Sequence, residues 1–384
     1  MTKSKVSFVL PFLALGIGLF AGGFGPYFVP IQIGALIDSL GLSESQSGLL
    51  GAVEVASMAL TAILISPKLA SWSRSRTAMY GVVFAAVCEI ATGFVSSLLI
   101  LFPLRIFVGV GCGFVFGSIC ATAASGKNPD RMLGAASAIM NFLFLFMFLL
   151  MPYTLAFAQQ KGLFFALGIV LLMTLPFLRF LSNENVNTDA EEFAEKKTNR
   201  IMVAMHMTAV VLLNIGLGAL WGFVERMGTD NVGLSPEEIG RVLSIATLFM
   251  IAGSLFAAWL GVRIGRTVPV VCATLLCGLA AILVTNSETL VIYAAGLFLY
   301  NFAYLFLGPY TIAGISSALD PSGRLAAAVG GVMFFSYSIG IGTGGFIAEL
   351  ISLSGIGILA LCTCLLAAPL FAIVTTQLEK EAPQ

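Results

Sequence analysis

Charged residues are scarce in this sequence. Aspartate, glutamate, lysine and arginine together account for 10% of its 384 residues, against roughly 25% in soluble domains, and histidine occurs once. Hydrophobic residues account for 59%, and the mean hydropathy is +1.01. This composition excludes an ordinary soluble protein and predicts a chain embedded in a lipid bilayer. The formal net charge is zero, so overall charge says nothing about binding partners.

The chain also lacks the motifs of nucleotide binding, zinc ligation and nucleophilic catalysis. Its most glycine-rich run, Gly340–Gly345, is not followed by Gly-Lys-Ser/Thr and lies inside an apolar segment. The seven cysteines all fall in apolar runs, and this odd number indicates packing residues, not disulfides or a metal site. We therefore expect no cofactor, no metal and no nucleic-acid partner, and neither an ATP-driven pump nor an enzyme.

What the chain does contain is long apolar runs separated by short polar breaks. A helix needs about 20 mostly apolar residues to cross a bilayer, and none of these runs shows the alternation of a strand. An all-α polytopic fold follows, because helices satisfy their own backbone polar groups in lipid. The twelve predicted spans are 8–36, 46–67, 77–97, 98–124, 132–157, 162–182, 201–226, 236–259, 267–286, 289–317, 324–350 and 354–377.

Two segments are near copies of each other. GLSESQSG at 41–48 and GLSPEEIG at 233–240 are 192 residues apart (233 − 41), half the length of the chain. In each, a serine followed three residues later by glutamine or glutamate predicts a capping box that starts a helix. Pro129 and Pro321, each in a polar turn, have the same separation. The chain therefore consists of two copies of one unit.

Lysine and arginine indicate the orientation of the two copies. With the N-terminus in the cytoplasm, fifteen of these residues fall on the cytoplasmic side and three outside, a strong positive-inside bias. Both termini are then cytoplasmic, and the polar segment 183–200 is a cytoplasmic linker between six-helix bundles at 1–182 and 201–384. Because each bundle begins and ends inside, the two are parallel repeats.

Twelve helices in two parallel halves, with a cytoplasmic linker and cytoplasmic ends, resemble the major facilitator superfamily of secondary transporters. The fourth predicted helix also fits the family pattern R-x-x-x-G-x-G-x-G. Its matching residues are Arg105, Gly109, Gly111 and Gly113. The resemblance covers essentially the whole chain and implies that the predicted helices 1, 4, 7 and 10 surround a central cavity.

The family's loop motif, G-x-L-a-D-R-x-G-R-R, is present here in degraded form. The loop after the second predicted helix keeps Leu69, Ala70 and Arg76, and the equivalent loop of the second half keeps Leu260, Arg263, Gly265 and Arg266. The resemblance implies a gating role for the arginines of these loops, Arg76, Arg263 and Arg266. Neither copy has the acidic residue of the motif.

Three ionisable residues lie well inside predicted helices of the first half, namely Glu54, Glu89 and Arg105. A charge inside the membrane costs at least ~2.5–3.5 kcal/mol, so each is expected to face a cavity or a partner. Glu89 and Arg105 lie about 12 Å from the turn at Ser97, and Glu54 lies roughly 16 Å along its own helix. All three therefore fall in one layer between the outer surface and the midplane.

Two interpretations of this layer stay open. A carboxylate there would take up and release a proton, with Arg105 as a switchable counter-ion. The resemblance implies this role, because an arginine at this position accompanies proton coupling in many members. The alternative is a permanent Glu89–Arg105 ion pair that only locks two helices together.

Polar and aromatic residues on the predicted helices 1, 7 and 10 are candidates for a substrate wall. They are Tyr27, Gln32, Asn214, Trp221, Glu225, Tyr300, Asn301 and Tyr304. Asn214, Trp221 and Glu225 share one helical face by their spacing. The alternatives are packing, an interfacial position and, for Glu225, an extracellular gate. His206 is expected to snorkel towards the cytoplasm.

The sequence thus predicts a secondary active transporter of a small organic solute, amphipathic or aromatic, that works by alternating access. Proton-coupled uptake is preferred over proton-antiport efflux because 138–156 lacks the glycines that resemblance associates with antiporters. A non-transporting receptor on the same fold is the third alternative. We expect a monomer with the lipid bilayer and protons as its other partners, in a bacterial inner membrane.

Overall fold

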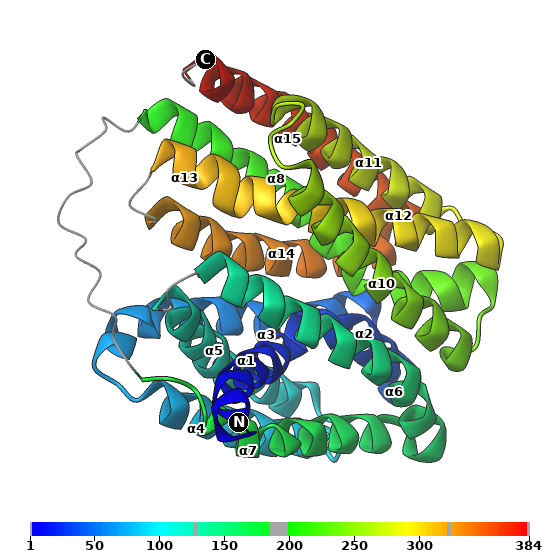
Figure 1. The fold of residues 1–384 in the computed structure, drawn as a ribbon. Helices are drawn as coiled ribbons and strands as arrows, with labels where there is room; N and C mark the ends of the chain where they lie inside the picture. Colours follow the sequence, from blue (N-terminus) through cyan, green and yellow to red (C-terminus); the bar gives the residue numbers. More distant parts are fainter. Residues whose placement is uncertain (1, 126–128, 184–198, 321–323, 382–384) are drawn as a thin grey trace. The chain divides into compact units, whose positions relative to one another are not determined.

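The structure, a computed structural model, describes residues 2–125, 129–183, 199–320 and 324–381. Within these ranges helices account for almost all of the chain and no strand is formed, which confirms the all-helical prediction. The chain divides into two compact units, 1–188 and 189–384, drawn in Figure 1. Of the predicted linker 183–200, only residues 183, 199 and 200 lie within the described part, so the linker stays a prediction.

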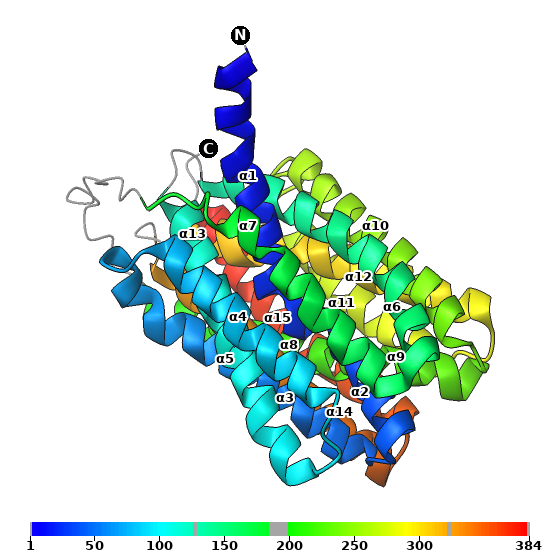
Figure 2. The same ribbon diagram turned by 90° about the horizontal axis from the view of Figure 1, so that it is seen from below.

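The described residues of the first unit form seven α-helices and a 3₁₀ turn. They are α1 (Thr2–Gly22), α2 (Phe24–Leu40), α3 (Glu44–Ile65), η1 (Ser66–Ala70), α4 (Arg74–Thr92), α5 (Leu98–Ala124), α6 (Pro129–Met173) and α7 (Leu175–Leu178). Helix α5 packs against both α3 and α4, and α1 packs against α5 and α6 (Figure 2). Helix α5 is therefore held between two neighbours, which matters for the site below.

The first unit departs from the predicted spans at Gly23, and it is broken between 157 and 162, where the sequence predicts a turn. The span 8–36 is divided at Gly23 into α1 and α2. The spans 132–157 and 162–182 form the single element α6, which is broken at Ala158 and Gln159; Gln159 has a φ of 51°, a conformation that is uncommon outside glycine. The next residue secures this turn, because the Gln160 amide donates to the carbonyl oxygens of Thr92 (2.7 Å) and Val95 (3.0 Å).

The second unit follows the same order with more interruptions. Its elements are α8 (Arg200–Gly222), α9 (Val224–Arg226), η2 (Met227–Asn231), α10 (Pro236–Leu260), α11 (Thr267–Thr285), α12 (Leu290–Gly308), η3 (Pro309–Ile315), α13 (Ser316–Leu319), α14 (Arg324–Leu350) and α15 (Leu353–Glu381). The predicted helix 201–226 breaks after Gly222, and 289–317 continues beyond Gly308 as the π-helical segment η3. Helix α8 packs against α14 and α15.

The duplication seen in the sequence recurs in the packing. Helix pairs α3–α5 and α4–α5 of the first unit correspond to α10–α12 and α11–α12 of the second. Both predicted capping boxes are present, at Ser43 and Ser235. Gly41 and Gly233, each two residues before the serine, have φ values of 64° and 74°, a conformation that glycine adopts without strain. The two units are therefore built on the same local signals.

Ten helices in the described residues are long and apolar enough to cross a membrane. Two of the twelve predicted spans are missing from this set for separate reasons. Helix α4, from the predicted span 77–97, carries Arg74, Arg76 and Glu89 and is not among the ten. The two spans that form α6 are counted once. The number twelve and the orientation of the termini therefore stay predictions.

Candidate functional site

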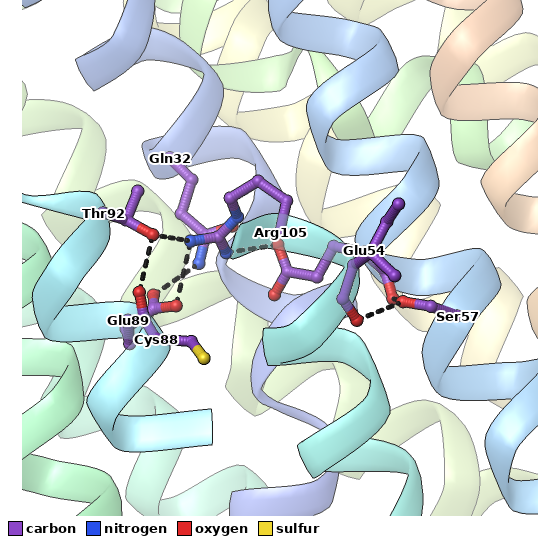
Figure 3. Close-up of polar contacts among 8 residues, drawn as sticks. Gln32, Glu54, Ser57, Cys88, Glu89, Thr92 and Arg105 are labelled. Carbon is purple, nitrogen blue, oxygen red and sulfur yellow. Dashed lines mark hydrogen bonds and ion pairs between the residues drawn. The ribbon is translucent and has the colours of Figure 1, made fainter. Parts of the chain in front are cut away.

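A group of buried charges lies where α3, α4 and α5 meet (Figure 3). The guanidinium group of Arg105 on α5 forms ion pairs with Glu54 on α3 and with Glu89 on α4, the latter at 2.9 Å between Nη1 and Oε2. None of the three side chains is more than 1% exposed. We call Glu54, Glu89 and Arg105 the charge cluster. The structure thus brings together the three residues that the sequence placed in one layer.

Glycines on α5 explain how one arginine reaches two neighbouring helices. A Cβ atom on Gly109 would lie 2.1 Å from the carbonyl oxygen of Glu54, and one on Gly111 would lie 2.7 Å from the carbonyl oxygen of Gly81. Only glycine permits these approaches, so α5 sits close to α3 on one face and to α4 on another. Arg105 lies one helical turn before Gly109 and is thereby held between the two glutamates.

Neutral polar groups complete the surroundings of the charge cluster. The Gln32 amide on α2 donates to Oε1 of Glu89 at 3.1 Å, and Arg105 Nη1 donates to the Thr92 hydroxyl at 3.5 Å. The Arg105 guanidinium also lies 5.3 Å from the centre of the Phe164 ring. Gln32, predicted as a substrate contact, is therefore placed by the structure against the charge cluster.

The second unit holds a row of four aromatic rings. Trp221 on α8, Tyr300 and Tyr304 on α12 and Tyr337 on α14 form what we call the aromatic row. Successive ring centres are 6.1, 6.0 and 6.4 Å apart, and the rings are inclined by 18°, 13° and 20°. The sequence predicted the first three of these residues but missed Tyr337, because no local pattern links α14 to the row.

Hydrogen bonds tie the aromatic row to α8. The Tyr304 hydroxyl donates to Asn214 Oδ1 at 3.2 Å, and the Tyr300 hydroxyl donates to the carbonyl oxygen of Leu217 at 3.3 Å. Asn214 in turn donates to the carbonyl oxygen of Val210. Asn301 is buried and donates to Leu297 of its own helix, with no hydrogen bond to the row.

Two other predicted substrate contacts, Tyr27 and Glu225, have partners of their own. Tyr27 stacks on Phe144 of α6, with 3.9 Å between ring centres, and its hydroxyl donates to Asn141 Oδ1 at 3.2 Å. Glu225 accepts a hydrogen bond from the Thr229 hydroxyl at 3.0 Å, beyond the end of α8. Neither contact belongs to the charge cluster or the aromatic row.

The loop arginines are arranged differently from one another. Arg76 and Arg263 are exposed, and the Arg263 guanidinium lies 5.1 Å from the Trp259 ring. Arg266 is bound through its backbone, because its N–H and that of Thr267 both donate to the carboxylate of Glu379. Helix α15 thus brings a carboxylate to a loop whose own sequence lacks the motif's acid.

The first unit has a matching contact made by an amide. Asn183 Oδ1 accepts from the backbone N–H of Ser75 and from the Ser73 hydroxyl, each at 3.4 Å. Ser75 and Thr267 are related by the 192-residue offset (267 − 75). In the first unit, therefore, a side-chain oxygen of Asn183 accepts hydrogen bonds at the start of α4. In the second unit, the carboxylate of Glu379 does so at the start of α11.

His206 is buried, so the expectation that it snorkels was wrong. Its Nε2 lies 3.0 Å from the carbonyl oxygen of Thr311 and 3.2 Å from the Ser316 hydroxyl. Thr311 belongs to the π-helical segment η3, and its carbonyl oxygen also accepts a hydrogen bond from the Ser316 hydroxyl at 2.9 Å. Position along a helix did not indicate which face the ring occupies.

Comparison with known proteins gives one family and a set of similar folds. The family model of the Major Facilitator Superfamily matches residues 13–229. No curated protein matches the chain.

Three solved structures are similar over almost the entire chain. The crystal structure of a D-xylose-proton symporter has a TM-score of 0.73 at 13% identity and covers 94% of this chain and 97% of its own. The human organic anion transporter MFSD10 (TETRAN) has a TM-score of 0.68 at 16% identity, covering 97% and 100%. A bacterial homologue of the human lysosomal transporter Spinster, inward-facing and unoccupied, has a TM-score of 0.75 at 15% identity, covering 100% of both chains. At these identities the likeness shows the fold alone.

Proposed function

The chain belongs to the major facilitator superfamily, whose members are transporters and not enzymes, and on this premise we propose that it takes up a small organic solute together with protons. The observation that carries the proposal is the charge cluster. Ionisable side chains inside a membrane are costly and are kept where a function needs them. A fold that also serves a D-xylose-proton symporter is compatible with this use.

In this proposal all twelve predicted segments cross the membrane. Helix α6 crosses twice, with the break at Ala158 and Gln159 as its turn. Helix α4 crosses despite its charges, because Arg74 and Arg76 lie at its first residues and Glu89 is paired with Arg105. Both termini are then cytoplasmic, in a bacterial inner membrane.

The charge cluster supplies the coupling in this proposal. A guanidinium beside a carboxylate stabilises the ionised form, and moving the guanidinium away favours the protonated form. Arg105 contacts both Glu54 and Glu89, so a helix movement between transport states that alters these contacts changes the proton occupancy of the cluster. Uptake of a proton and movement of the helices are thereby linked.

The aromatic row supports a solute with an aromatic or amphipathic character. Ring faces bind flat apolar groups, and the Tyr304 hydroxyl and the Asn214 amide bind polar substituents. None of the residues in the row carries a charge, so a multiply charged solute is disfavoured. We propose Asn214, Trp221, Tyr300 and Tyr304 as solute contacts.

The test is transport into liposomes by the purified protein, after ligands have been found by thermal shift. Wild-type protein should accumulate the solute only with a proton gradient, and Arg105→Ala should bind it without accumulating it. Arg241→Ala, a change at an exposed arginine of α10, is the matched control and should transport normally.

A variant that removes all three charges, Glu54→Ala/Glu89→Ala/Arg105→Leu, covers the case in which Arg105→Ala does not fold. Accumulation that ignores the proton gradient in the wild type would contradict coupling. Solute leaving inside-loaded vesicles as protons enter would favour efflux, and binding without any translocation would favour a receptor.

A further inference from the structure

The charge cluster contains two acids and one base. Arg105 forms ion pairs with Glu54 and Glu89, and in the described part of the chain no other charged side chain pairs with any of the three. With both glutamates ionised, the cluster would carry one uncompensated negative charge. With one of them protonated, the cluster is neutral. A buried group avoids an uncompensated charge by changing its protonation, so the neutral form is favoured.

We propose that the charge cluster binds one proton and that this proton resides on Oε1 of Glu54. The inference rests on the proposed function and assigns its coupling proton to one atom. Release breaks the O–H bond of the Glu54 carboxyl group, leaves the electron pair on Oε1 and passes the proton to water. Glu89 keeps its negative charge throughout and remains the fixed partner of Arg105.

The hydrogen bonds of the two glutamates distinguish them. Both oxygens of Glu89 accept from N–H donors, Oε1 from Gln32 at 3.1 Å and Oε2 from Arg105 at 2.9 Å. Glu54 uses only Oε2, which is paired with Arg105, whereas its Oε1 is buried without a hydrogen-bond partner. An ionised oxygen left without a donor costs more than a neutral one. The carboxylate with two donors is therefore the ionised one.

The groups around the cluster do not alter this charge count. Facing it are the thiols of Cys88 on α4 and Cys112 on α5, which are neutral when protonated. Helix α2 contributes the Gln32 amide, and α6 contributes the Phe164 ring. No lysine, histidine or further carboxylate lies in contact among the described residues, so Glu54 and Glu89 are the only acids that can hold the proton.

The backbone of α2 covers the proposed proton site. A Cβ atom on Gly25 would lie 2.9 Å from Glu54 Oε1, so this oxygen rests against α2 at a residue without a side chain. A movement of α2 away from α3 would expose Oε1 of Glu54 and withdraw the Gln32 amide from Oε1 of Glu89, but it would leave Oε2 of Glu89 paired with Arg105. The proton site can then reach water while the Glu89–Arg105 ion pair stays intact.

Infrared difference spectroscopy of the purified protein tests the assignment without transport. At neutral pH the wild type should show one carboxylic-acid C=O band, lowered in frequency by the hydrogen bond that Arg105 donates to Oε2 of Glu54. Glu54→Gln should remove the band. Glu54→Asp should shift it, and Glu89→Asp, which leaves the charge count unchanged, should not. Glu237→Gln, at a residue outside the cluster, is the control for unrelated acids.

The outcomes separate this inference from the proposed function. A wild type without the band, a band that persists in Glu54→Gln, or a band that moves in Glu89→Asp overturns the assignment to Glu54. If the band behaves as expected but uptake in liposomes ignores the proton gradient, the site binds its proton and the proposed coupling fails. If uptake follows the gradient and the band is absent, coupling stands and the location is wrong.

Discussion

Equivalent helices of the two units are packed alike but hold different side chains. Adding the 192-residue offset to Glu54, Glu89 and Arg105 gives Ala246, Ala281 and Leu297, all fully buried in the second unit. The pairs α3–α5 and α4–α5 thus recur as α10–α12 and α11–α12 without any buried charge. This packing does not need the charges. The comparison therefore favours a functional role for the charge cluster over a permanent lock between helices.

The contacts at the start of α4 and of α11 show the opposite pattern, because they are present in both units. Both units place an oxygen acceptor there, from Asn183 in the first and from Glu379 in the second. A contact that both copies keep, with different chemistry, belongs to the fold. Features shared by the units therefore indicate scaffold, and features confined to one unit indicate function.

The largest expected effect comes from making the first unit resemble the second. Arg105→Leu alone leaves two buried acids without their counter-charge and should cost about 3 kcal/mol of stability, although protonation of both acids softens the loss. Glu54→Ala/Glu89→Ala/Arg105→Leu removes the whole cluster and should stay within about 1 kcal/mol of the wild type, because replacing a buried ion pair by apolar groups is often nearly neutral. Thermal unfolding in detergent measures both.

The same two variants also test the alternative interpretation, in which the charges only hold the helices together. If the triple variant unfolds at a lower temperature than Arg105→Leu, the charges hold the helices together and the lock between α4 and α5 is their role. Proton-driven accumulation should be lost in both variants, so the order of stabilities decides between the two interpretations.

Local signals in the sequence account for most of the fold. Apolar length places the helices, and the serines at 43 and 235 predict helix starts that the capping boxes confirm. The layer of Glu54, Glu89 and Arg105 could be predicted because Glu89 and Arg105 lie at equal distances before and after the turn at Ser97. The break at Gly23 could not, because an apolar run continues through it, whereas the break at Gln159 falls in the predicted gap between 157 and 162.

Contacts between distant residues left no sequence signal. Glu379 binds the backbone of Arg266 across 113 residues, and a backbone N–H is the same in every residue type but proline. Gln32 was predicted on the substrate side because its position on a helix does not indicate which neighbour its amide meets. Tyr337 was missed for the same reason. Only the packed structure shows these partners.

A smaller effect is expected in the second unit, at the aromatic row. The positions of the first unit equivalent to Trp221 and Tyr300 are Val29 and Val108, so the row is confined to one copy. Tyr304→Phe removes the hydroxyl that donates to Asn214 and should weaken solute binding about tenfold if the row contacts the solute. Binding is measured by titration of the purified protein.

Tyr293→Phe is the matched control for this change. The Tyr293 hydroxyl donates to the carbonyl oxygen of Val224 at 2.7 Å, outside the row. Both variants should lose about 1 kcal/mol of stability, the usual contribution of one hydrogen bond, but only Tyr304→Phe should lose affinity. Equal affinity losses would show that the row is packing and not a solute site.

The smallest effect is expected at the shared contact, where the two units differ by one charge. Glu379→Gln replaces a carboxylate at the start of α11 by an amide and should cost about 0.5 kcal/mol, because a negative charge near a helix N-terminus is stabilising. Asn183→Asp makes the reverse change at α4 and should gain a similar amount at low salt. Both shifts in unfolding temperature should shrink as salt is added, since exposed charges are screened.

Solute uptake should be unchanged in both variants, because a contact kept by both copies serves the fold. If Glu379→Gln lowers uptake while the protein stays folded, this contact takes part in gating, and the rule that shared features are scaffold fails at that point.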